Sequence, residues 1–218
     1  TVIICLSGSS IDLLTGNDAD AIIQGWYPGA LGGLAIAELL SGAYNPSGKL
    51  PVTFYSHKNH LPDYEDYSMV DRTYRFMKEK PLYSFGFGLS YSRFVFQSLV
   101  LDSKTLKAGD ALKGSFTCKN EGPFSGRVVI QYYLVHDSTQ KRNLTHFHQI
   151  SLECKEQKIV QFSIDPEALT IVDDAAHRTY GLGKWTLYAG CFQPDARTKE
   201  LLGDYFEYAI VSDTCMLI

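Results

Sequence analysis

The chain has 218 residues, of which 45% are apolar and 20% are charged, an ordinary globular balance that excludes wholesale disorder. The net charge is −4, no lysine or arginine run exceeds two residues, and no apolar run approaches the ~18 residues of a membrane span, so we predict neither a nucleic-acid nor a membrane partner. The 14 tyrosines and 12 phenylalanines favour β-structure and sugar-facing surfaces.

Residues 1–55 have the pattern of the end of an open α/β sheet. Residues 1–6 and 21–26 predict short strands that are apolar on both faces, as in a parallel sheet covered on both sides. Leucines at helical spacing predict a helix over 33–40, and residues 50–54 are expected to be extended. Because nothing in the sequence precedes the first strand to cover it, we interpret the chain as the C-terminal piece of a longer protein.

The remaining chain divides into a loop-rich segment and a β-rich one. Residues 56–94 have little periodicity, but their many aromatic residues predict an ordered linker that packs against both neighbours. From residue 95 to 218, short alternating segments separated by turn residues predict an all-β sandwich. The expected strands include 111–120, 126–136, 146–154, 158–164, 184–191 and 206–212.

The five cysteines predict structural thiols. Their number is odd, and no pair has the spacing of a CxxC motif. Unpaired cysteines favour a reducing compartment, so we expect a cytoplasmic location.

Four strings in a fixed order carry a resemblance to a known family. They are Trp26-Tyr27-Pro28-Gly29, NPSGKLPVT at 45–53, RTYRF at 72–76 and PLYSFGFGLSY at 81–91. Together they closely resemble the C-terminal half of glycoside hydrolase family three, the β-glucosidase and β-xylosidase family. The string GRVVIQYY at 126–133 is similar to the fibronectin type III-like domain of that family.

The resemblance implies a fold and a place in a larger architecture. Members of the family have a TIM-like barrel, then an α/β sandwich domain, then the fibronectin type III-like β-sandwich. This chain would hold the C-terminal part of the α/β sandwich domain (1–55), the ordered linker (56–94) and the whole β-sandwich (95–218).

The resemblance also implies a function. The parent protein would be an exo-acting retaining β-glycosidase that needs no cofactor and removes non-reducing terminal sugars from plant-derived oligosaccharides or aryl glycosides. The nucleophile and the acid/base of the family precede the matched region, so we assign no catalytic residue here and expect the chain alone to be inactive, with the N-terminal barrel portion as its partner. The string at 72–76 favours the β-xylosidase or α-arabinofuranosidase type, with a β-glucosidase as the alternative.

Four residues are candidates for substrate binding. Trp26 and Tyr27 follow a strand, at the edge where open α/β sheets bind ligands, and could stack on a sugar; alternatively they pack a domain interface. Arg72 and Arg75 could orient a carboxylate of a neighbouring barrel, or could instead pair with Asp66 or Asp71.

Other polar clusters carry weaker expectations. We interpret the acidic residues Asp63, Glu65, Asp66 and Asp71 as a solvated, turn-forming loop rather than a catalytic pair. The histidine pairs His57/His60 and His146/His148 lack a third ligand nearby, so no metal site is predicted.

A second class of function is a non-catalytic module. The sandwich would then bind carbohydrate, brace other domains or form a homo-oligomer interface. An exposed row of aromatic residues would favour carbohydrate binding; its candidates are Tyr132, Tyr188, Tyr205 and Tyr208.

Overall fold

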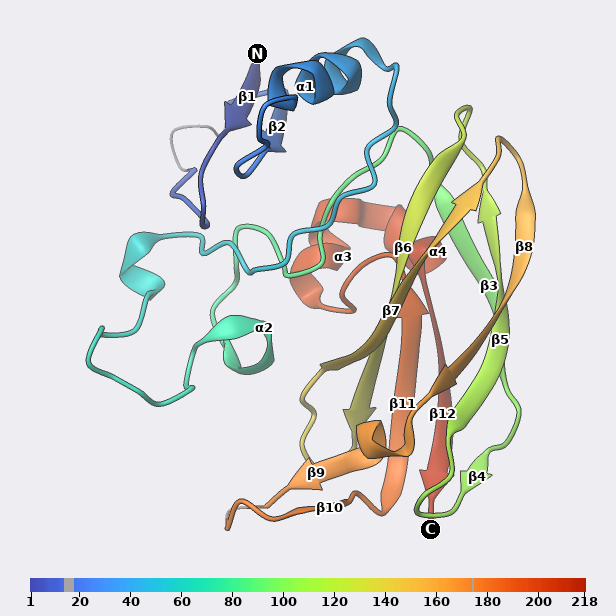
Figure 1. The fold of residues 1–218 in the computed structure, drawn as a ribbon. Helices are drawn as coiled ribbons and strands as arrows, with labels where there is room; N and C mark the ends of the chain where they lie inside the picture. Colours follow the sequence, from blue (N-terminus) through green and yellow to red (C-terminus); the bar gives the residue numbers. More distant parts are fainter. Residues whose placement is uncertain (14–17, 174) are drawn as a thin grey trace.

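The computed structural model describes residues 1–13, 18–173 and 175–218 (Figure 1). A small N-terminal α/β unit lies beside one end of a β-sandwich, and a long loop-rich segment connects the two. The strands are β1 (Val2–Cys5), β2 (Ala21–Gln24), β3 (Phe94–Leu101), β4 (Thr105–Leu106), β5 (Leu112–Asn120), β6 (Gly126–His136), β7 (Asn143–Leu152), β8 (Gln157–Ile164), β9 (Thr170–Val172), β10 (Arg178–Tyr180), β11 (Gly183–Gly190) and β12 (Ile210–Leu217). The α-helices are α1 (Gly32–Ser41), α2 (Thr73–Phe76), α3 (Ala196–Leu202) and α4 (Phe206–Ala209), with 3-10 turns at Lys58–His60, Pro166–Leu169 and Gly203–Tyr205.

The N-terminal unit is a parallel strand pair with one helix. β1 and β2 pair in parallel, with Ile3 opposite Ile22, which confirms the expected parallel arrangement. α1 ends where Gly42 takes φ 77°, a left-handed conformation that glycine adopts without strain. Much of the unit's apolar surface is uncovered, and none of the apolar side chains of α1 is buried.

The sandwich consists of two sheets. One has the strand order β4-β12-β11-β6-β7 and the other β3-β5-β8. All neighbouring strands are antiparallel except β4 and β12. The inward positions of β5 and β8 are mostly buried and their outward positions are partly or fully exposed, because successive side chains of a strand point to opposite faces. Trp185, Phe116 and Tyr132 lie among the fully buried side chains of the core.

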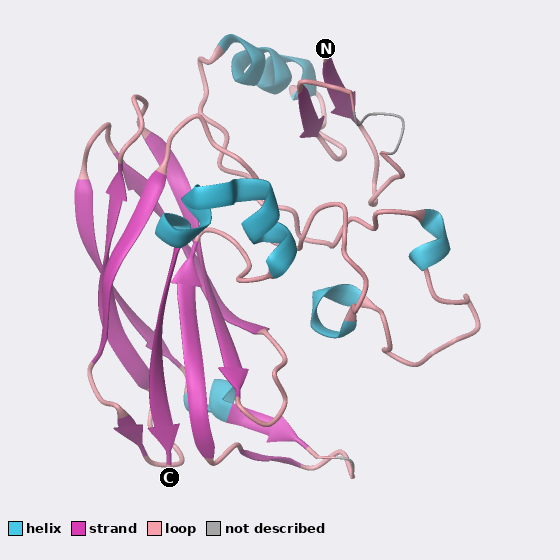
Figure 2. Ribbon diagram, turned by 180° about the vertical axis from the view of Figure 1, so that it is seen from behind, coloured by secondary structure: helices cyan, strands magenta, loops and turns pink. Residues whose placement is uncertain are grey.

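β6 is covered on both faces. Ile130, Tyr132 and Leu134 belong to the sandwich core, while the alternate residues Gln131 and Tyr133 point outward and are nevertheless buried. The linker provides this second cover, because Gln131 bonds the Gly86 backbone and the Tyr133 ring packs edge-on against Tyr74. Seen from behind, the loop-rich segment stands beside the strands, with α3 and α4 across the end of the sandwich that faces the N-terminal unit (Figure 2).

Three local expectations need correction. Residues 206–209 form helix α4 instead of the start of a strand, and the strand begins at Ile210. Residues 50–54 form no strand; only Phe54 makes an isolated bridge, with Tyr83. The second strand ends at Gln24, two residues before Trp26.

In the described part of the chain, no helix is both long enough and apolar enough to cross a membrane. All five cysteines are free thiols; four are buried and Cys154 is exposed. Burial raises the pKa of the Cys118 and Cys191 thiols, which keeps both protonated.

Candidate functional site

The turn after β2 carries the two aromatic candidates at the edge where the parallel strands end. Trp26 is half-buried and meets the Phe54 ring edge-on, with 6.4 Å between ring centroids. Its φ of 52° lies in the left-handed region that non-glycine residues avoid, so packing holds this turn in place. Tyr27 is 81% exposed, and its ring lies beside Gly8, where an added Cβ would meet Cε2 of the tyrosine at 2.8 Å. Trp26 therefore packs into the unit, whereas Tyr27 faces solvent.

A further residue at this edge, Gln24, is not among the candidates that the sequence predicts. Gln24 ends β2, and its Nε2 donates to the Ser7 hydroxyl at 3.1 Å and, at 3.4 Å, to the Ser7 carbonyl oxygen. Its Oε1 is buried without a hydrogen-bond partner in the described chain. A buried acceptor without a partner is unusual in proteins, so Gln24 is the residue of this edge most ready to accept a hydrogen bond from a ligand. The available signal was a polar residue that ends an apolar strand.

Arg72 bonds its own loop. Its Nε donates to the Ser68 carbonyl oxygen at 3.2 Å, and its Nη2 donates to the carbonyl oxygens of Asp63 at 3.0 Å and Asp66 at 2.5 Å. Arg75 is exposed, and its guanidinium carbon lies 6.0 Å from the centroid of the Tyr74 ring. Within the described residues, no hydrogen bond or ring contact joins either arginine to Trp26 or Tyr27.

The acidic side chains near Arg72 form turns. Asp63 accepts from the Glu65 amide at 2.9 Å, and Asp66 accepts from the Ser68 amide at 2.8 Å and from its hydroxyl at 3.1 Å. The two bonds from Ser68, with the charge of Arg72 as a smaller cause, lower the pKa of Asp66. This geometry is that of Asx turns in a solvated loop.

The histidine pairs do not form a metal site in the described part of the chain. His146 and His148 pack on the ring of Tyr132, at centroid distances of 5.4 and 5.6 Å. Burial, with His146 as a smaller cause, lowers the pKa of His148. His57 accepts from the Asn59 amide, and His60 hydrogen-bonds the Ser56 hydroxyl.

The four sandwich tyrosines do not form an exposed row. Tyr132 is fully buried in the core, and Tyr188 and Tyr205 are half-buried. Only Tyr208 among them is exposed, at 52%. A carbohydrate-binding face built from these residues is therefore not present.

The motif at 45–53 joins the N-terminal unit to the sandwich. Asn45 accepts from the Ser90 hydroxyl and the Tyr91 amide, and its Nδ2 donates to the Ser125 carbonyl oxygen at 3.0 Å. The Lys49 ammonium donates to the Gly88 carbonyl oxygen at 2.6 Å and lies 3.9 Å from the centroid of the Phe192 ring. Burial lowers the pKa of Lys49 to about 8.

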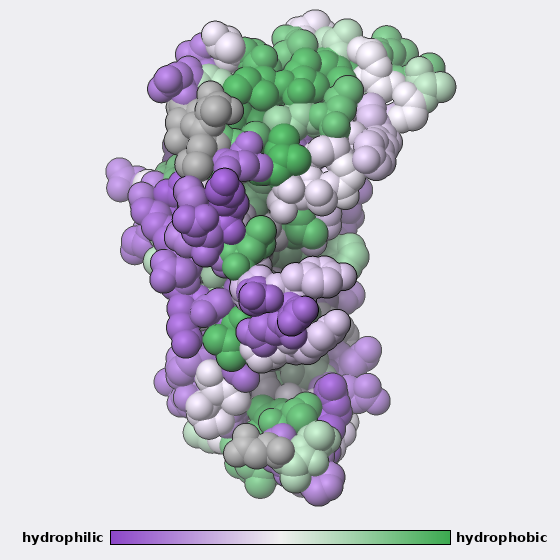
Figure 3. Space-filling model, turned by 90° about the vertical axis from the view of Figure 1, so that its left-hand side faces the viewer, coloured by the Kyte–Doolittle hydropathy of each residue, from purple (hydrophilic) through white to green (hydrophobic). Residues whose placement is uncertain are grey.

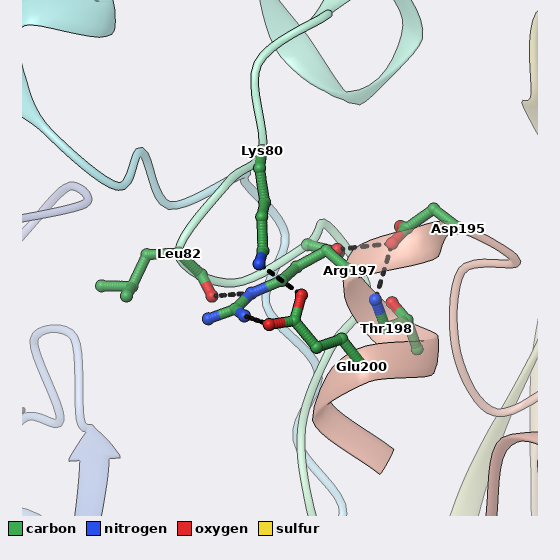
Figure 4. A network of polar contacts seen from close by, with 7 residues as sticks. Lys80, Leu82, Asp195, Arg197, Thr198 and Glu200 are labelled. Carbon is green, nitrogen blue, oxygen red and sulfur yellow. Dashed lines mark hydrogen bonds and ion pairs between the residues drawn. The ribbon is translucent and has the colours of Figure 1, made fainter. Parts of the chain in front are cut away.

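A second junction fixes the linker to α3. Asp195 caps this helix by accepting from the Thr198 amide at 2.7 Å, and the same oxygen accepts from the Ser84 hydroxyl at 3.0 Å. Figure 4 shows the neighbouring contacts, in which Arg197 donates to the Leu82 carbonyl oxygen at 3.0 Å. The Glu200 carboxylate forms ion pairs with Nη1 of Arg197, at 3.2 Å, and with Nζ of Lys80, at 2.5 Å. The hydrogen bonds and ion pairs of the two junctions make the linker part of the sandwich surface rather than a flexible tether.

Two family profiles match the chain. Residues 1–91 match the glycosyl hydrolase family 3 C-terminal domain, and residues 128–193 match the fibronectin type III-like domain.

Individual proteins are similar over most of the chain. A xylan 1,4-beta-xylosidase of Xylanibacter ruminicola is 36% identical over 201 residues, which cover 89% of this chain and 23% of that protein. A periplasmic beta-glucosidase of Salmonella typhimurium is 35% identical over 216 residues, or 91% of this chain and 28% of that protein. The solved beta-glucosidase of Erythrobacter marinus superposes with a TM-score of 0.79 at 29% identity, over 100% of this chain and 28% of that one. The chain thus spans about a quarter of the length of the relatives that it matches.

Proposed function

Because residues 1–91 match the glycosyl hydrolase family 3 C-terminal domain and residues 128–193 match the fibronectin type III-like domain, we propose that the chain is the C-terminal part of an exo-acting retaining β-glycosidase. Such a reaction needs two carboxylates about 5–5.5 Å apart, one as nucleophile and one as acid/base. The acidic side chains near Arg72 serve turns, and we assign neither role to them. The catalytic pair would come from the rest of the enzyme.

The uncovered apolar surface of the N-terminal unit carries this proposal. On α1 and just before it, Leu31, Leu34 and Leu40 are 71%, 56% and 51% exposed, and on β1 Val2 is 44% exposed. Figure 3 shows apolar residues gathered over the upper part of one face, where this unit lies. Parallel strands are normally covered by helices on both faces, and exposed apolar patches of this kind mark interaction sites. The proposed cover is the N-terminal portion of the enzyme, which completes the sheet and supplies the barrel.

The proposed substrate type is a β-xyloside or α-arabinofuranoside. The string at 72–76 and the similarity to the Xylanibacter xylosidase support this choice. The nearly equal similarity to the Salmonella beta-glucosidase supports a β-glucosidase as the alternative.

The test is hydrolysis of aryl β-xyloside, aryl β-glucoside and aryl α-arabinofuranoside by the chain alone and by the chain mixed with the N-terminal portion of its enzyme. We expect activity only in the mixture, with the preferred glycoside naming the sugar. Activity of the chain alone would refute the assignment of the catalytic pair to the rest of the enzyme. A stable complex that hydrolyses none of the three glycosides would contradict the proposed reaction.

A further inference from the structure

Residues 61–72, called the tyrosine loop below, display two fully accessible aromatic rings. Tyr64 is 92% exposed and Tyr67 is 90% exposed, the largest values among the exposed large apolar residues of the described chain. Burial of a large aromatic side chain is favourable, so two exposed rings on one short loop offer apolar area that a ligand can cover. In Figure 1 this part of the chain stands away from the sandwich, before α2.

The tyrosine loop is braced from within. The planar guanidinium of Arg72 donates hydrogen bonds to three backbone carbonyl oxygens, those of Asp63, Asp66 and Ser68. Two Asx turns, at Asp63 and Asp66, fix the backbone on either side of Glu65. A loop ordered before binding loses little conformational entropy when a ligand arrives, which is the advantage of preorganisation. The rings of Tyr64 and Tyr67 therefore stand on a backbone that is already ordered before a ligand binds.

The charge of the tyrosine loop restricts its ligand. The loop contains Asp63, Glu65, Asp66 and Asp71 against the single cation Arg72, a formal net charge of −3. An anionic ligand or an acidic protein surface would be repelled. A neutral polyol meets no such repulsion, and its hydroxyl groups can donate to carboxylates while its apolar ring faces lie on the tyrosines.

We propose that the tyrosine loop is a binding surface for neutral oligosaccharides, with Tyr64 and Tyr67 stacking on sugar rings and Arg72 as the residue that positions them. This goes beyond the proposed hydrolysis, because binding by the loop needs no residue outside the chain. The two proposals can therefore fail independently of each other.

The test is an NMR titration of the chain, isotope-labelled at tyrosine rings and backbone amides, with xylohexaose and cellohexaose. We expect saturable shifts at Tyr64 and Tyr67, and about a tenfold or greater loss of affinity in the double variant Tyr64→Ala/Tyr67→Ala. The double variant Tyr64→Phe/Tyr67→Phe retains binding, because stacking uses the ring. Phe147→Ala, at a position of β7 where the side chain is 64% exposed, is the matched control and leaves affinity unchanged.

Arg72→Lys separates positioning from stacking. A single ammonium cannot reproduce the fork of donors that bonds three carbonyl oxygens, so this variant weakens oligosaccharide binding and speeds hydrogen exchange at the Glu65 and Ser68 amides. The absence of shifts in the wild type, or equal affinity in the double alanine variant, overturns the proposal. A dimer of the chain that dissociates in the double alanine variant, seen by sedimentation without any sugar effect, would assign the loop to a second copy instead.

Discussion

Replacement of Gln131 by leucine should release the linker from the sandwich. Gln131 is 3% exposed, and its Nε2 donates to the carbonyl oxygens of Gly86 at 3.0 Å and Cys191 at 3.2 Å. Its Oε1 accepts from the Tyr133 hydroxyl at 2.7 Å. Leucine has a similar volume but no polar atoms, so two carbonyl groups and one hydroxyl would be left buried without this partner.

The size of the effect follows from those three groups. A buried polar group without a partner costs about 1–3 kcal/mol, so three of them set an upper range of about 3–9 kcal/mol. Because single substitutions rarely cost more than about 5 kcal/mol, we expect Gln131→Leu to lower the free energy of unfolding by about 3–5 kcal/mol. Gly86→Ala disrupts the same contact at the partner residue, because φ of Gly86 is 76° and an added Cβ would lie 2.1 Å from Oε1 of Gln131. The double variant should therefore lose less than the sum of the single losses, since both disrupt one contact.

Urea unfolding followed by tryptophan fluorescence measures these changes. The chain has two tryptophans, so a Trp26→Phe background leaves Trp185 of the sandwich core as the only reporter. Gln149→Leu, at an exposed position of β7, is the control and should change stability by less than about 0.5 kcal/mol. A loss below about 1 kcal/mol for Gln131→Leu would show that the linker does not depend on this side chain.

Two further changes test the junctions. The pKa of Lys49 in the folded chain, about 8, lies below that of an unfolded lysine, so the unfolded state binds more protons at pH values between the two. The free energy of unfolding of the wild type, relative to that of Lys49→Met, should therefore rise by about 1–3 kcal/mol from pH 8 to pH 10. A difference that does not change with pH would contradict the burial of the ammonium. Asp195→Ala removes the cap of α3 and the acceptor of the Ser84 hydroxyl, so it should lower the free energy of unfolding in urea by about 1–2 kcal/mol. The control Asp204→Ala, at an exposed position, should lower it by less than about 0.5 kcal/mol. Equal losses in the two variants would refute the capping role of Asp195.

The sequence pattern predicted the architecture because it is periodic where the fold is regular. Leucines at helical spacing marked α1. Alternation marked β5 and β8, since one face of each strand is buried and the other is exposed. The prediction of a strand over residues 206–212 was wrong in its first half, because a strand and a single helical turn cannot be distinguished in so short an apolar stretch. There the chain makes α4, which packs against β3 before β12 begins.

The contacts of the site were less predictable, because they join residues far apart in the chain. Arg72 was expected to reach a substrate or a carboxylate, but its donors meet backbone carbonyl oxygens, and no spacing rule in the sequence specifies such a target. Gln131 lies in an apolar strand, and its burial depends on Gly86, which is 45 residues away. The substrate-binding roles of Trp26, Tyr27, Arg72 and Arg75 stay predictions.

The bridge between Phe54 and Tyr83 makes the intervening segment a loop whose two ends are paired with each other. The Phe54 amide donates to the Tyr83 carbonyl oxygen at 3.0 Å, and the Leu82 amide donates to the Phe54 carbonyl oxygen at 2.8 Å, so the chain leaves and returns at one point. The entropy cost of closing such a loop grows only slowly with its length, and added residues need not move either flanking unit. Insertions or a single proteolytic cut within residues 61–71, which lie outside the contact of Tyr74 with β6, would therefore leave the N-terminal unit and the sandwich joined in their present arrangement, and chain length there is free to vary.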